Sequence, residues 1–246
     1  MQIEKYISVL DTKRFGFNVA KINEFNNTPE DTIDFFKSHN VKLVLSRIPV
    51  ENLALINKLE TLNFQIKDIQ LTYKYDLNKF HPNVIVKDEN IIIRNYKTTD
   101  IPILQTIALD SFSNYGHYAN DKRLDIKKCN DIYGDWISRS CEDKDVADVV
   151  FVAEYKGEIA GFLSFKILTA DKQKYAAGGI GAVSEKFRNN NIFSALVHEG
   201  LAWGKEKELN WEEHNVLANN YPVSKSFIKS GFYIVKSFVS LHCWID

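Results

Sequence analysis

The sequence is poor in the residues that build disulfide networks and metal sites. Its three cysteines are far apart and form no Cys-x-x-Cys pair, so we expect neither a disulfide framework nor a zinc site. Its six histidines show no paired helical spacing and no accompanying carboxylate motif, and we therefore predict that no metal is bound. Because this cysteine usage fits a reducing compartment, we expect the protein in the cytoplasm.

Long apolar runs and clusters of one charge are also missing. No segment is long enough to span a bilayer, and Glu4 and Lys5 interrupt the start of the chain, so the sequence predicts neither membrane insertion nor a signal peptide. The 31 basic and 32 acidic residues nearly cancel without a Lys/Arg-rich run, which argues against a nucleic-acid partner. We therefore expect small-molecule substrates.

The sequence does contain enough apolar residues for a core. Apolar residues make up 45% of the 246 positions and aromatic residues 13%, which suits one substantial core or two modest ones. A polar stretch with one proline, residues 76–90, separates two parts of the chain. We therefore predict an N-terminal α/β domain over residues 1–80, a linker over 81–90 and a second domain over 91–246.

The two parts end in a similar pattern. Residues 55–75 and 223–244 each read as an amphipathic helix, an Asn-Phe or Gly-Phe turn and an alternating strand. Asn63 and Gly231 are predicted to end these helices in the left-handed conformation. The pattern indicates either two related halves or a coincidence, because such a string is common.

The second part is typical of an α+β fold. Val149–Tyr155 and Glu158–Leu168 flank a Lys-Gly turn, which predicts a hairpin. Antiparallel strands interrupted by helices indicate a mixed, mostly antiparallel sheet with helices on its faces. Further strands are predicted over residues 91–94, 175–183 and 215–218, and helices over 101–108, 132–139 and 192–207.

One segment of the second part carries a family resemblance. Residues 181–196 read GAVSEKFRNNNIFSAL, and this segment, with the order of elements, resembles the GNAT acyltransferase family. In that family a strand leads into a Q/R-x-x-G-x-G/A loop that opens a helix, where successive backbone N–H groups suit the pyrophosphate of coenzyme A. The resemblance implies a GNAT fold and an acyl-CoA co-substrate, and it offers a degenerate GNAT-like half as one interpretation of residues 1–80.

The segment departs from the family pattern at both glycines. Asn191 and Phe193 occupy these positions, and Asn readily adopts the positive φ that the turn requires. Phe193 is expected either beside the pantetheine or in the core. Taken alone, the segment also fits an Asn-rich loop before an ordinary amphipathic helix. The resemblance implies contacts to coenzyme A from Ala182, Val183, Arg188, Asn189, Asn190, Asn191, Ile192, Phe193, Asn220 and Phe227.

A second match lies near the C-terminal end. Residues 220–232, NYPVSKSFIKSGF, are similar to the family's N-x-x-A-x-x-x-Y-x-x-x-G-F element, whose Asn contacts coenzyme A and whose Tyr protonates the departing thiolate. Asn220 matches, whereas Phe227 stands where the Tyr belongs and has no proton to give. Ser224 lies one helical turn earlier on the same face. We take Ser224 as a candidate catalytic group, and the equal alternative is that it only lines a polar helix face.

A third match concerns the acceptor. Residues 110–124, DSFSNYGHYANDKRL, and residues 133–136 are similar to nucleotide-sugar N-acyltransferases related to TDP-fucosamine acetyltransferase. Residues 10–22 resemble the opening of those proteins, although Thr12, Lys13 and Lys122 depart from their patterns. The resemblance implies transfer of an acyl group, from acetyl-CoA or 3-hydroxybutyryl-CoA, to the amino group of a dTDP-linked amino-deoxysugar in surface polysaccharide biosynthesis.

The side chains of this patch suit a sugar nucleotide. Aromatic faces can stack on a pyranose and a base, and amide and imidazole groups give directional hydrogen bonds. The resemblance implies a general base on the strand predicted over 175–183, where relatives often place an Asp or Glu, but this strand has neither. His117, whose ordinary pKa suits proton transfer near neutral pH, is therefore the candidate general base. The alternative is a loop whose aromatic residues simply belong to the core. The predicted substrate-binding residues are Tyr115, His117, Tyr118, Asn120, Tyr133 and Trp136.

Two other functions stay open at this point. One is a GNAT N-acetyltransferase that acts on a protein or small-molecule amine. The other is a non-catalytic acyl-CoA-binding protein, which the missing Tyr and the missing glycines favour. The resemblance is also compatible with a homodimer.

Overall fold

The computed structural model describes residues 2–81 and 88–245. The linker predicted over residues 81–90 therefore lies largely outside the described residues. The strands of the described residues form one nine-stranded sheet in the order β1-β2-β9-β3-β8-β7-β6-β5-β4. Their bounds are β1 Asn18–Lys21, β2 Val41–Pro49, β3 Gln65–Asp76, β4 Ile91–Asn95, β5 Val149–Tyr155, β6 Glu158–Ala170, β7 Gln173–Val183, β8 Trp211–Leu217 and β9 Tyr233–Trp244.

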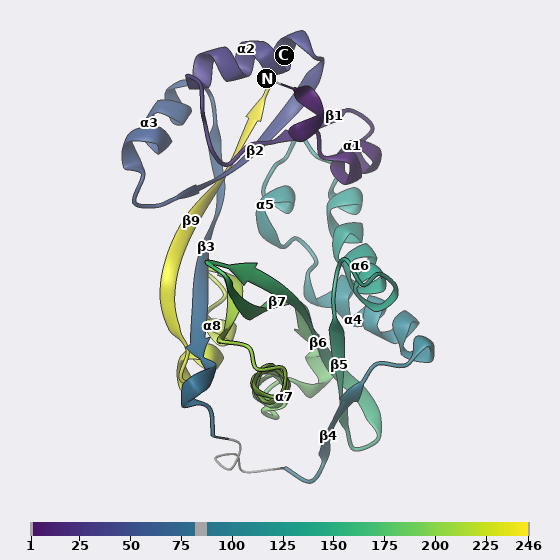
Figure 1. Ribbon diagram of the computed structural model, residues 1–246. Coiled ribbons are helices and arrows are strands. Elements are labelled where there is room, and N and C mark those ends of the chain that lie inside the picture. Colours follow the sequence, from purple (N-terminus) through teal and green to yellow (C-terminus); the bar gives the residue numbers. More distant parts are fainter. Residues whose placement is uncertain (1, 82–87, 246) are drawn as a thin grey trace.

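The C-terminal strand joins the two parts of the chain. β9 lies between β2 and β3 and pairs antiparallel with both, so residues 1–80 and 91–246 contribute to the same sheet. Figure 1 shows β9 and β3 as two long, curved neighbours, with both chain termini at the same end of the molecule. β1 and β2 are parallel, as are β7 and β8, whereas the other pairs are antiparallel. The predicted mixed, mostly antiparallel sheet is confirmed.

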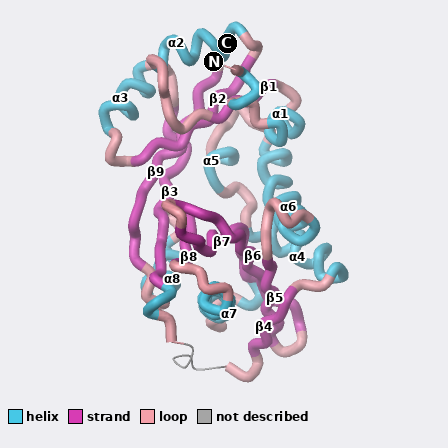
Figure 2. The backbone as a smooth tube through the Cα atoms, in the orientation of Figure 1, coloured by secondary structure: helices cyan, strands magenta, loops and turns pink. Residues whose placement is uncertain are grey.

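The helices cover both faces of the sheet. α4 and α6 bury side chains against one face of β5, including Val150 and Val152, and α7 packs on the other, against Phe151 and Ala153. Figure 2 shows α7 and the α4–α6 pair on opposite sides of β5, β6 and β7. The helices are α1 Val9–Phe15, α2 Pro29–Ser38, α3 Leu53–Thr61, α4 Ile101–Ser111, α5 Gly116–Ala119, α6 Ile126–Glu142, α7 Ile192–Glu206 and α8 Tyr221–Lys229.

Several local predictions are confirmed. Asn63 and Gly231 have φ angles of 65° and 89°, so both end their helices in the left-handed region. Lys156 and Gly157 have φ angles of 52° and 84°, as a tight turn between two hairpin strands requires. The strand and helix predicted over 175–183 and 192–207 correspond to β7 and α7.

Two elements begin well before their predicted start. The helix predicted over 132–139 begins at Ile126, where Asp125 caps its first turn by accepting a hydrogen bond from the Lys127 N–H. The strand predicted over 215–218 begins at Trp211. Its first residues look polar, yet Glu212 is fully buried with its carboxylate on His214. A buried polar pair of this kind interrupts the hydrophobic alternation by which a strand is recognised in a sequence.

Candidate active site

Strands β7 and β8 separate from each other near the middle of the sheet. Their parallel pairing covers only Tyr175–Ala177 and Trp211–Glu213, although β7 runs on to Val183 and β8 to Leu217. The main-chain groups of β7 that face β8 beyond Ala177 therefore have no strand partner. Backbone donors left unpaired beside a strand are a ready site for an extended ligand.

The loop after β7 adopts the turn expected of it. Asn189 and Asn191 have φ angles of 67° and 57°, so two asparagines supply the left-handed conformations that glycine supplies more often. α7 begins at Ile192, and the side chain of Asn191 makes no capping hydrogen bond. The first turn of α7 thus keeps its N–H groups free of a side-chain cap. The side chain of Asn190 is hydrogen-bonded within the loop, because its Nδ2 donates to the Phe187 carbonyl.

The aromatic residues predicted to contact coenzyme A lie mostly inside the molecule. Phe193 is half-buried and meets Phe227 edge to face with ring centroids 5.6 Å apart, so of its two expected positions it takes the one in the core. Phe227 is only 1% exposed and packs on His214 and Tyr73. Arg188 and Asn189 are exposed. Contacts of these residues with coenzyme A stay predictions.

The start of α8 presents two polar groups toward this region. Asn220 caps α8 by accepting from the Val223 N–H, and its Nδ2 donates to the Tyr115 hydroxyl at 3.3 Å. The Ser224 hydroxyl is buried and has no hydrogen-bond partner among the described residues. A buried hydroxyl without a partner is unfavourable, so Ser224 fits a position that is completed by a bound ligand.

The predicted acceptor segment docks onto the N-terminal part of the chain. Asn120 Nδ2 donates to the Lys67 carbonyl at 2.7 Å, which ties the segment to β3. The Tyr133 hydroxyl donates to the Tyr115 carbonyl at 2.8 Å. Tyr133 and Tyr118 are largely interior, and burial raises the pKa of both phenols. Trp136 is half-buried against the core cluster of α4 and α6.

His117 belongs to a chain of polar contacts that reaches into the sheet. Its Nδ1 lies 2.8 Å from Nε2 of His242 on β9, and Nδ1 of His242 lies 2.7 Å from Oδ2 of Asp121. The same carboxylate oxygen accepts from the Trp244 indole N–H at 3.0 Å. Sequence analysis missed His242 as a partner because 125 residues separate it from His117, and no local spacing reveals such a pair.

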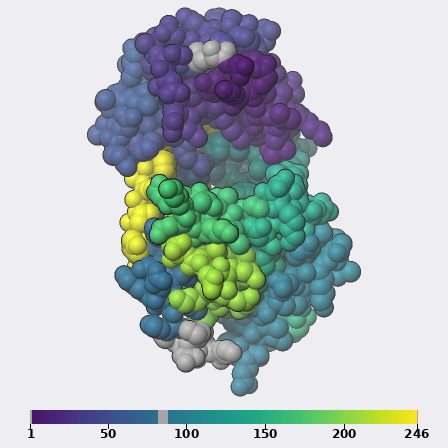
Figure 3. Space-filling view, in the orientation of Figure 1, coloured from purple at the N-terminus to yellow at the C-terminus, as the bar shows by residue number. Residues whose placement is uncertain are grey.

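Two adjoining hollows form one polar groove on the face of the sheet that carries Arg47, Ser240 and Asn215. The smaller, of about 170 Å³, is lined by His117, Lys21 and Ser240, among others. The larger, of about 600 Å³, is lined by Glu213, Asn215 and Lys236, among others. Asn23 and Arg47 line both hollows, so the two lie side by side. Figure 3 shows the surface recessed between the purple N-terminal residues and the green segment.

β7 carries no Asp or Glu, but the neighbouring strand β8 carries a carboxylate close to the point where the two strands separate. Glu213 on β8 is the cross-strand partner of Ala177 on β7 and lines the larger hollow. The Trp211 indole N–H donates to its Oε2 at 3.2 Å. Residues 175–183 by themselves do not reveal Glu213, because the parallel register of β7 and β8 is a tertiary feature.

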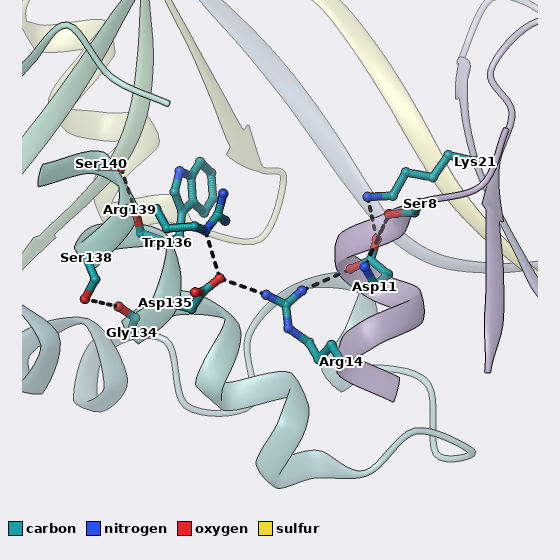
Figure 4. A network of polar contacts seen from close by, with 10 residues as sticks. All are labelled: Ser8, Asp11, Arg14, Lys21, Gly134, Asp135, Trp136, Ser138, Arg139 and Ser140. Carbon is teal, nitrogen blue, oxygen red and sulfur yellow. Dashed lines mark hydrogen bonds and ion pairs between the residues drawn. The ribbon is translucent and has the colours of Figure 1, made fainter. Parts of the chain in front are cut away.

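An ion-pair network holds the N-terminal helix against the acceptor segment. Asp11 on α1 is almost fully buried and binds Lys21 at 2.6 Å and Arg14 at 3.0 Å. Arg14 reaches across to Asp135 on α6 at 3.0 Å, and Asp135 also binds Arg139. Figure 4 shows this continuous line of contacts from α1 to α6. Because Lys21 also lines the smaller hollow, the network fixes one wall of the groove.

Comparisons with known proteins bear on this site. A model of the Acetyltransferase (GNAT) family matches residues 108–232, which include β7, the loop, α7, β8 and α8. A GCN5-related N-acetyltransferase from Sphaerobacter thermophilus shares the fold with 13% identity and a TM-score of 0.59, and the match covers 87% of this chain and 65% of that one. The present chain thus spans about two thirds of the Sphaerobacter protein. No curated protein matches the sequence.

Two further solved structures are similar. A tandem GNAT protein from the clavulanic acid biosynthesis pathway has 11% identity and a TM-score of 0.64 over 92% of this chain and 75% of its own. A glucosamine N-acetyltransferase region of a fungal multi-domain GH3 β-N-acetylglucosaminidase has 11% identity and a TM-score of 0.63, over 96% of this chain and 30% of its own. At such identities the likeness shows the fold, and the predicted GNAT fold is confirmed. The tandem protein fits the expected two-half architecture.

Residues 2–81 and 88–245 contain neither a metal-binding group nor a membrane-spanning helix. Among these residues, no group of three or more His, Cys, Asp or Glu side chains is placed to hold a metal ion. None of the helices that they form is both long and apolar enough to cross a membrane.

Proposed function

Because the chain belongs to the GNAT acetyltransferase family, whose members take the acyl group from acyl-CoA, we propose that it transfers that group to the amino group of a nucleotide-linked amino-deoxysugar. The observation that carries the proposal is the separation of β7 and β8 beside a polar groove. Unpaired main-chain donors on one side and a polar acceptor groove on the other are what transfer between two substrates requires.

The donor side of the site suits acyl-CoA. Main-chain N–H groups at the end of β7, near Val183, would hold the thioester oxygen. The loop over Arg188–Phe193 and the first turn of α7 would receive the pyrophosphate. The buried Ser224 hydroxyl, unpartnered in the described part of the chain, would lie near the leaving sulfur. Since a thiol has a pKa of about 8.5, the thiolate is a good leaving group and needs little help.

The acceptor side suits an anionic substrate better than a lysine side chain. The cations that line the two hollows are Lys21, Arg47 and Lys236, against the acids Glu24 and Glu213. An acceptor lysine or protein N-terminus would favour an acidic groove, whereas a diphosphate favours cations. The Arg47 Nε is buried and has no hydrogen-bond partner among the described residues, so it is available to a phosphate oxygen.

Two more observations support a sugar nucleotide. Phe25 and Phe238 line the larger hollow and offer ring faces for a nucleobase. The fungal region with the same fold acts on glucosamine, so amino-sugar acylation is compatible with this architecture. We propose dTDP as the nucleotide and a role in surface polysaccharide biosynthesis, with acetyl-CoA or 3-hydroxybutyryl-CoA as donor.

The reaction needs a free amine, a held carbonyl and a protonated leaving group. The amine nitrogen attacks the thioester carbon, the C–N bond forms, the C–S bond breaks, and the amine's proton passes to a base. We propose His117, which lines the smaller hollow, as that base, with Ser224 or water returning a proton to the sulfur. Placing the two substrates together can account for roughly 7 to 11 kcal/mol of the barrier.

An assay of thiol release tests the proposal. Acetyl-CoA and 3-hydroxybutyryl-CoA are each combined with dTDP- and UDP-linked amino sugars, the corresponding free amino sugars and a lysine peptide. We expect release of coenzyme A with a nucleotide-linked amino sugar and much less with the free sugar. Turnover confined to the peptide would instead indicate a GNAT enzyme for protein amines. Saturable acyl-CoA binding without turnover on any amine would indicate a non-catalytic acyl-CoA-binding protein.

A further inference from the structure

The contacts of His117 define an uninterrupted line of three ionisable groups. Asp121 Oδ2, both ring nitrogens of His242 and Nδ1 of His117 follow one another at 2.7 and 2.8 Å. The His242 side chain is fully buried and that of Asp121 is 2% exposed, whereas His117 lines the groove. The line therefore runs from the interior of the sheet to the surface where the acceptor is expected.

Hydrogen-bonding rules assign a proton to each link of this line. Asp121 accepts from the Trp244 indole, the Arg123 main chain and His242. Burial alone would raise its pKa, yet the hydrogen bonds from His242 and Trp244 lower that pKa to about 2, so near neutral pH Asp121 is an acceptor only. The His242 Nδ1 must then carry a hydrogen.

The second link follows from the first. Burial lowers the pKa of His242, although Asp121 offsets part of this effect, so the ring is neutral above pH 7 and its Nε2 holds a lone pair. That lone pair requires a donor, and the nearest group is Nδ1 of His117 at 2.8 Å. His117 is also neutral, because burial and then His242 keep its pKa well below the usual value. Because the hydrogen of His117 is on Nδ1, its Nε2 carries a free lone pair.

We propose that Asp121 and His242 are positioning residues that fix the tautomer of His117, so that its Nε2 accepts the proton of the acceptor amine. This inference rests on the proposed function and adds two residues to it. When the amine attacks, its proton moves to Nε2, and the imidazolium that forms keeps its Nδ1–H on His242. The carboxylate of Asp121 stabilises the positive charge through the His242 ring. The proton leaves to solvent after the amide is released.

Charged groups from several neighbouring elements act on His117. The cations Arg47 and Lys21 oppose its protonation, and the carboxylate of Asp121 favours it. The carboxylate of Asp121 thus offsets part of the effect that burial and the two cations have on the pKa of His117. The charged or titratable groups that act on the ring are His242 on β9, Arg47 on β2, Lys21 on β1 and Asp121 after α5. The Tyr118 ring packs on it with centroids 3.9 Å apart, and Asp68 on β3 accepts from the His117 main chain.

The ¹⁵N chemical shifts of the imidazole nitrogens test the relay, that is, the line from Asp121 through His242 to His117, without any reaction. In protein labelled with ¹⁵N-histidine, two-dimensional NMR at pH 7.5 distinguishes protonated from unprotonated ring nitrogens. We expect His242 and His117 both to carry their hydrogen on Nδ1, with His117 Nε2 unprotonated. A hydrogen on His117 Nε2 in the wild-type protein would overturn the proposal, whatever the enzyme acts on.

An isosteric variant tests the catalytic consequence. Both carboxylate oxygens of Asp121 accept hydrogen bonds. In Asp121→Asn an NH₂ group, which can only donate, replaces one of these oxygens, so the hydrogen positions on His242 and His117 are disturbed. We expect kcat to fall by about 10- to 10⁴-fold, as with the comparable Asp→Asn change in a catalytic triad, while KM for acyl-CoA stays unchanged. Asp34→Asn, on the exposed face of α2, is the matched control and should keep kcat within about twofold.

The two failures can be told apart. If no amine is acylated, the proposed function fails, and the NMR pattern still decides whether the relay exists. If the wild-type protein is active but Asp121→Asn, shown to be folded by its circular dichroism and melting temperature, keeps full kcat and an unshifted pH profile, the relay fails. Loss of kcat together with a changed His117 tautomer, at unchanged KM, is the expected result.

Discussion

At the scale of single residues, the site depends on groups that are costly to bury. His242 and Asp121 are interior, and a buried imidazole without partners would cost free energy. Here each buried nitrogen has one partner. The position of His117 is therefore set by a chain of contacts rather than by its own short helix, α5.

Replacing His117 tests the proposed base directly. His117→Asn removes the group that accepts the amine's proton but keeps a polar side chain in the groove. We expect kcat to fall about 10²- to 10⁴-fold and KM for the acceptor to change much less, measured by steady-state thiol release. A pH–rate profile that is identical to the wild-type profile would remove His117 from the role. A larger loss of kcat in Glu213→Gln would transfer that role to Glu213.

The buried histidines also make stability depend on pH. Burial lowers the pKa of both His117 and His242, so below the ordinary value of about 6.5 the unfolded chain binds protons that the folded chain does not. Stability is then fully present above this value and is lost as the pH falls from 6.5 toward the folded-state pKa values. Each proton contributes at most about 1.4 kcal/mol per pH unit.

Melting temperatures between pH 8 and pH 5 measure this effect. We expect the midpoint to fall most steeply below pH 6.5. His39→Asn serves as the control, because His39 is exposed at the end of α2 and the slope should remain as in the wild type. A slope that is unchanged in His117→Asn would contradict the assignment.

At the scale of elements, a glycine is required where β7 and β8 begin to separate. A Cβ atom added at Gly178 would lie 1.9 Å from Nδ1 of His214, whose other nitrogen is held by the fully buried Glu212. We expect Gly178→Ala to destabilise the protein by about 1–3 kcal/mol or more through overpacking, measured by urea unfolding. It should also reduce acyl-CoA affinity, because the shift occurs beside the proposed donor site.

Gly134 on α6 offers a matched comparison. Its added Cβ would meet only the end of the Leu109 side chain at 3.2 Å, and Ala is preferred to Gly inside a helix by roughly 0.5–1 kcal/mol. We expect Gly134→Ala to leave stability unchanged or slightly raised. Equal losses in the two variants would mean that general crowding, and not the His214 contact, makes glycine necessary at position 178.

At the scale of the whole molecule, the two parts of the chain depend on each other. β9 has β2 on one side and β3 on the other, and β3 also pairs with β8. Residues 91–246 alone would leave both edges of β9 and one edge of β8 without partners, exposing main-chain groups and apolar side chains. Sheet topology thus predicts that the second domain proposed from sequence does not fold in isolation.

Expression of residues 91–246 tests this expectation. We expect an aggregated or poorly structured fragment with a collapsed amide NMR spectrum, and partial recovery on co-expression with residues 1–80. A dispersed spectrum and cooperative melting of the fragment alone would show that the predicted division at residues 81–90 is a true domain boundary.

The sequence by itself determined the local features of this protein. The Lys-Gly hairpin turn, the left-handed Asn63 and Gly231, the left-handed asparagines before α7 and the helix α7 all follow from interactions between residues close in the chain. The family motif depends on the same local geometry. Such features can be predicted from the sequence because helix propensity and capping depend on only a few neighbouring residues.

Only the tertiary structure decided which distant residues meet. The position of β9 between β2 and β3, the pairing of Glu213 with Ala177 and the line from Asp121 through His242 to His117 depend on strand order and register. Hydrophobic alternation specifies which face of a strand is buried but not which strand lies next to it. The proposed donor site is therefore built largely from residues close in the chain, whereas the proposed catalytic relay arises from packing contacts between segments more than 100 residues apart.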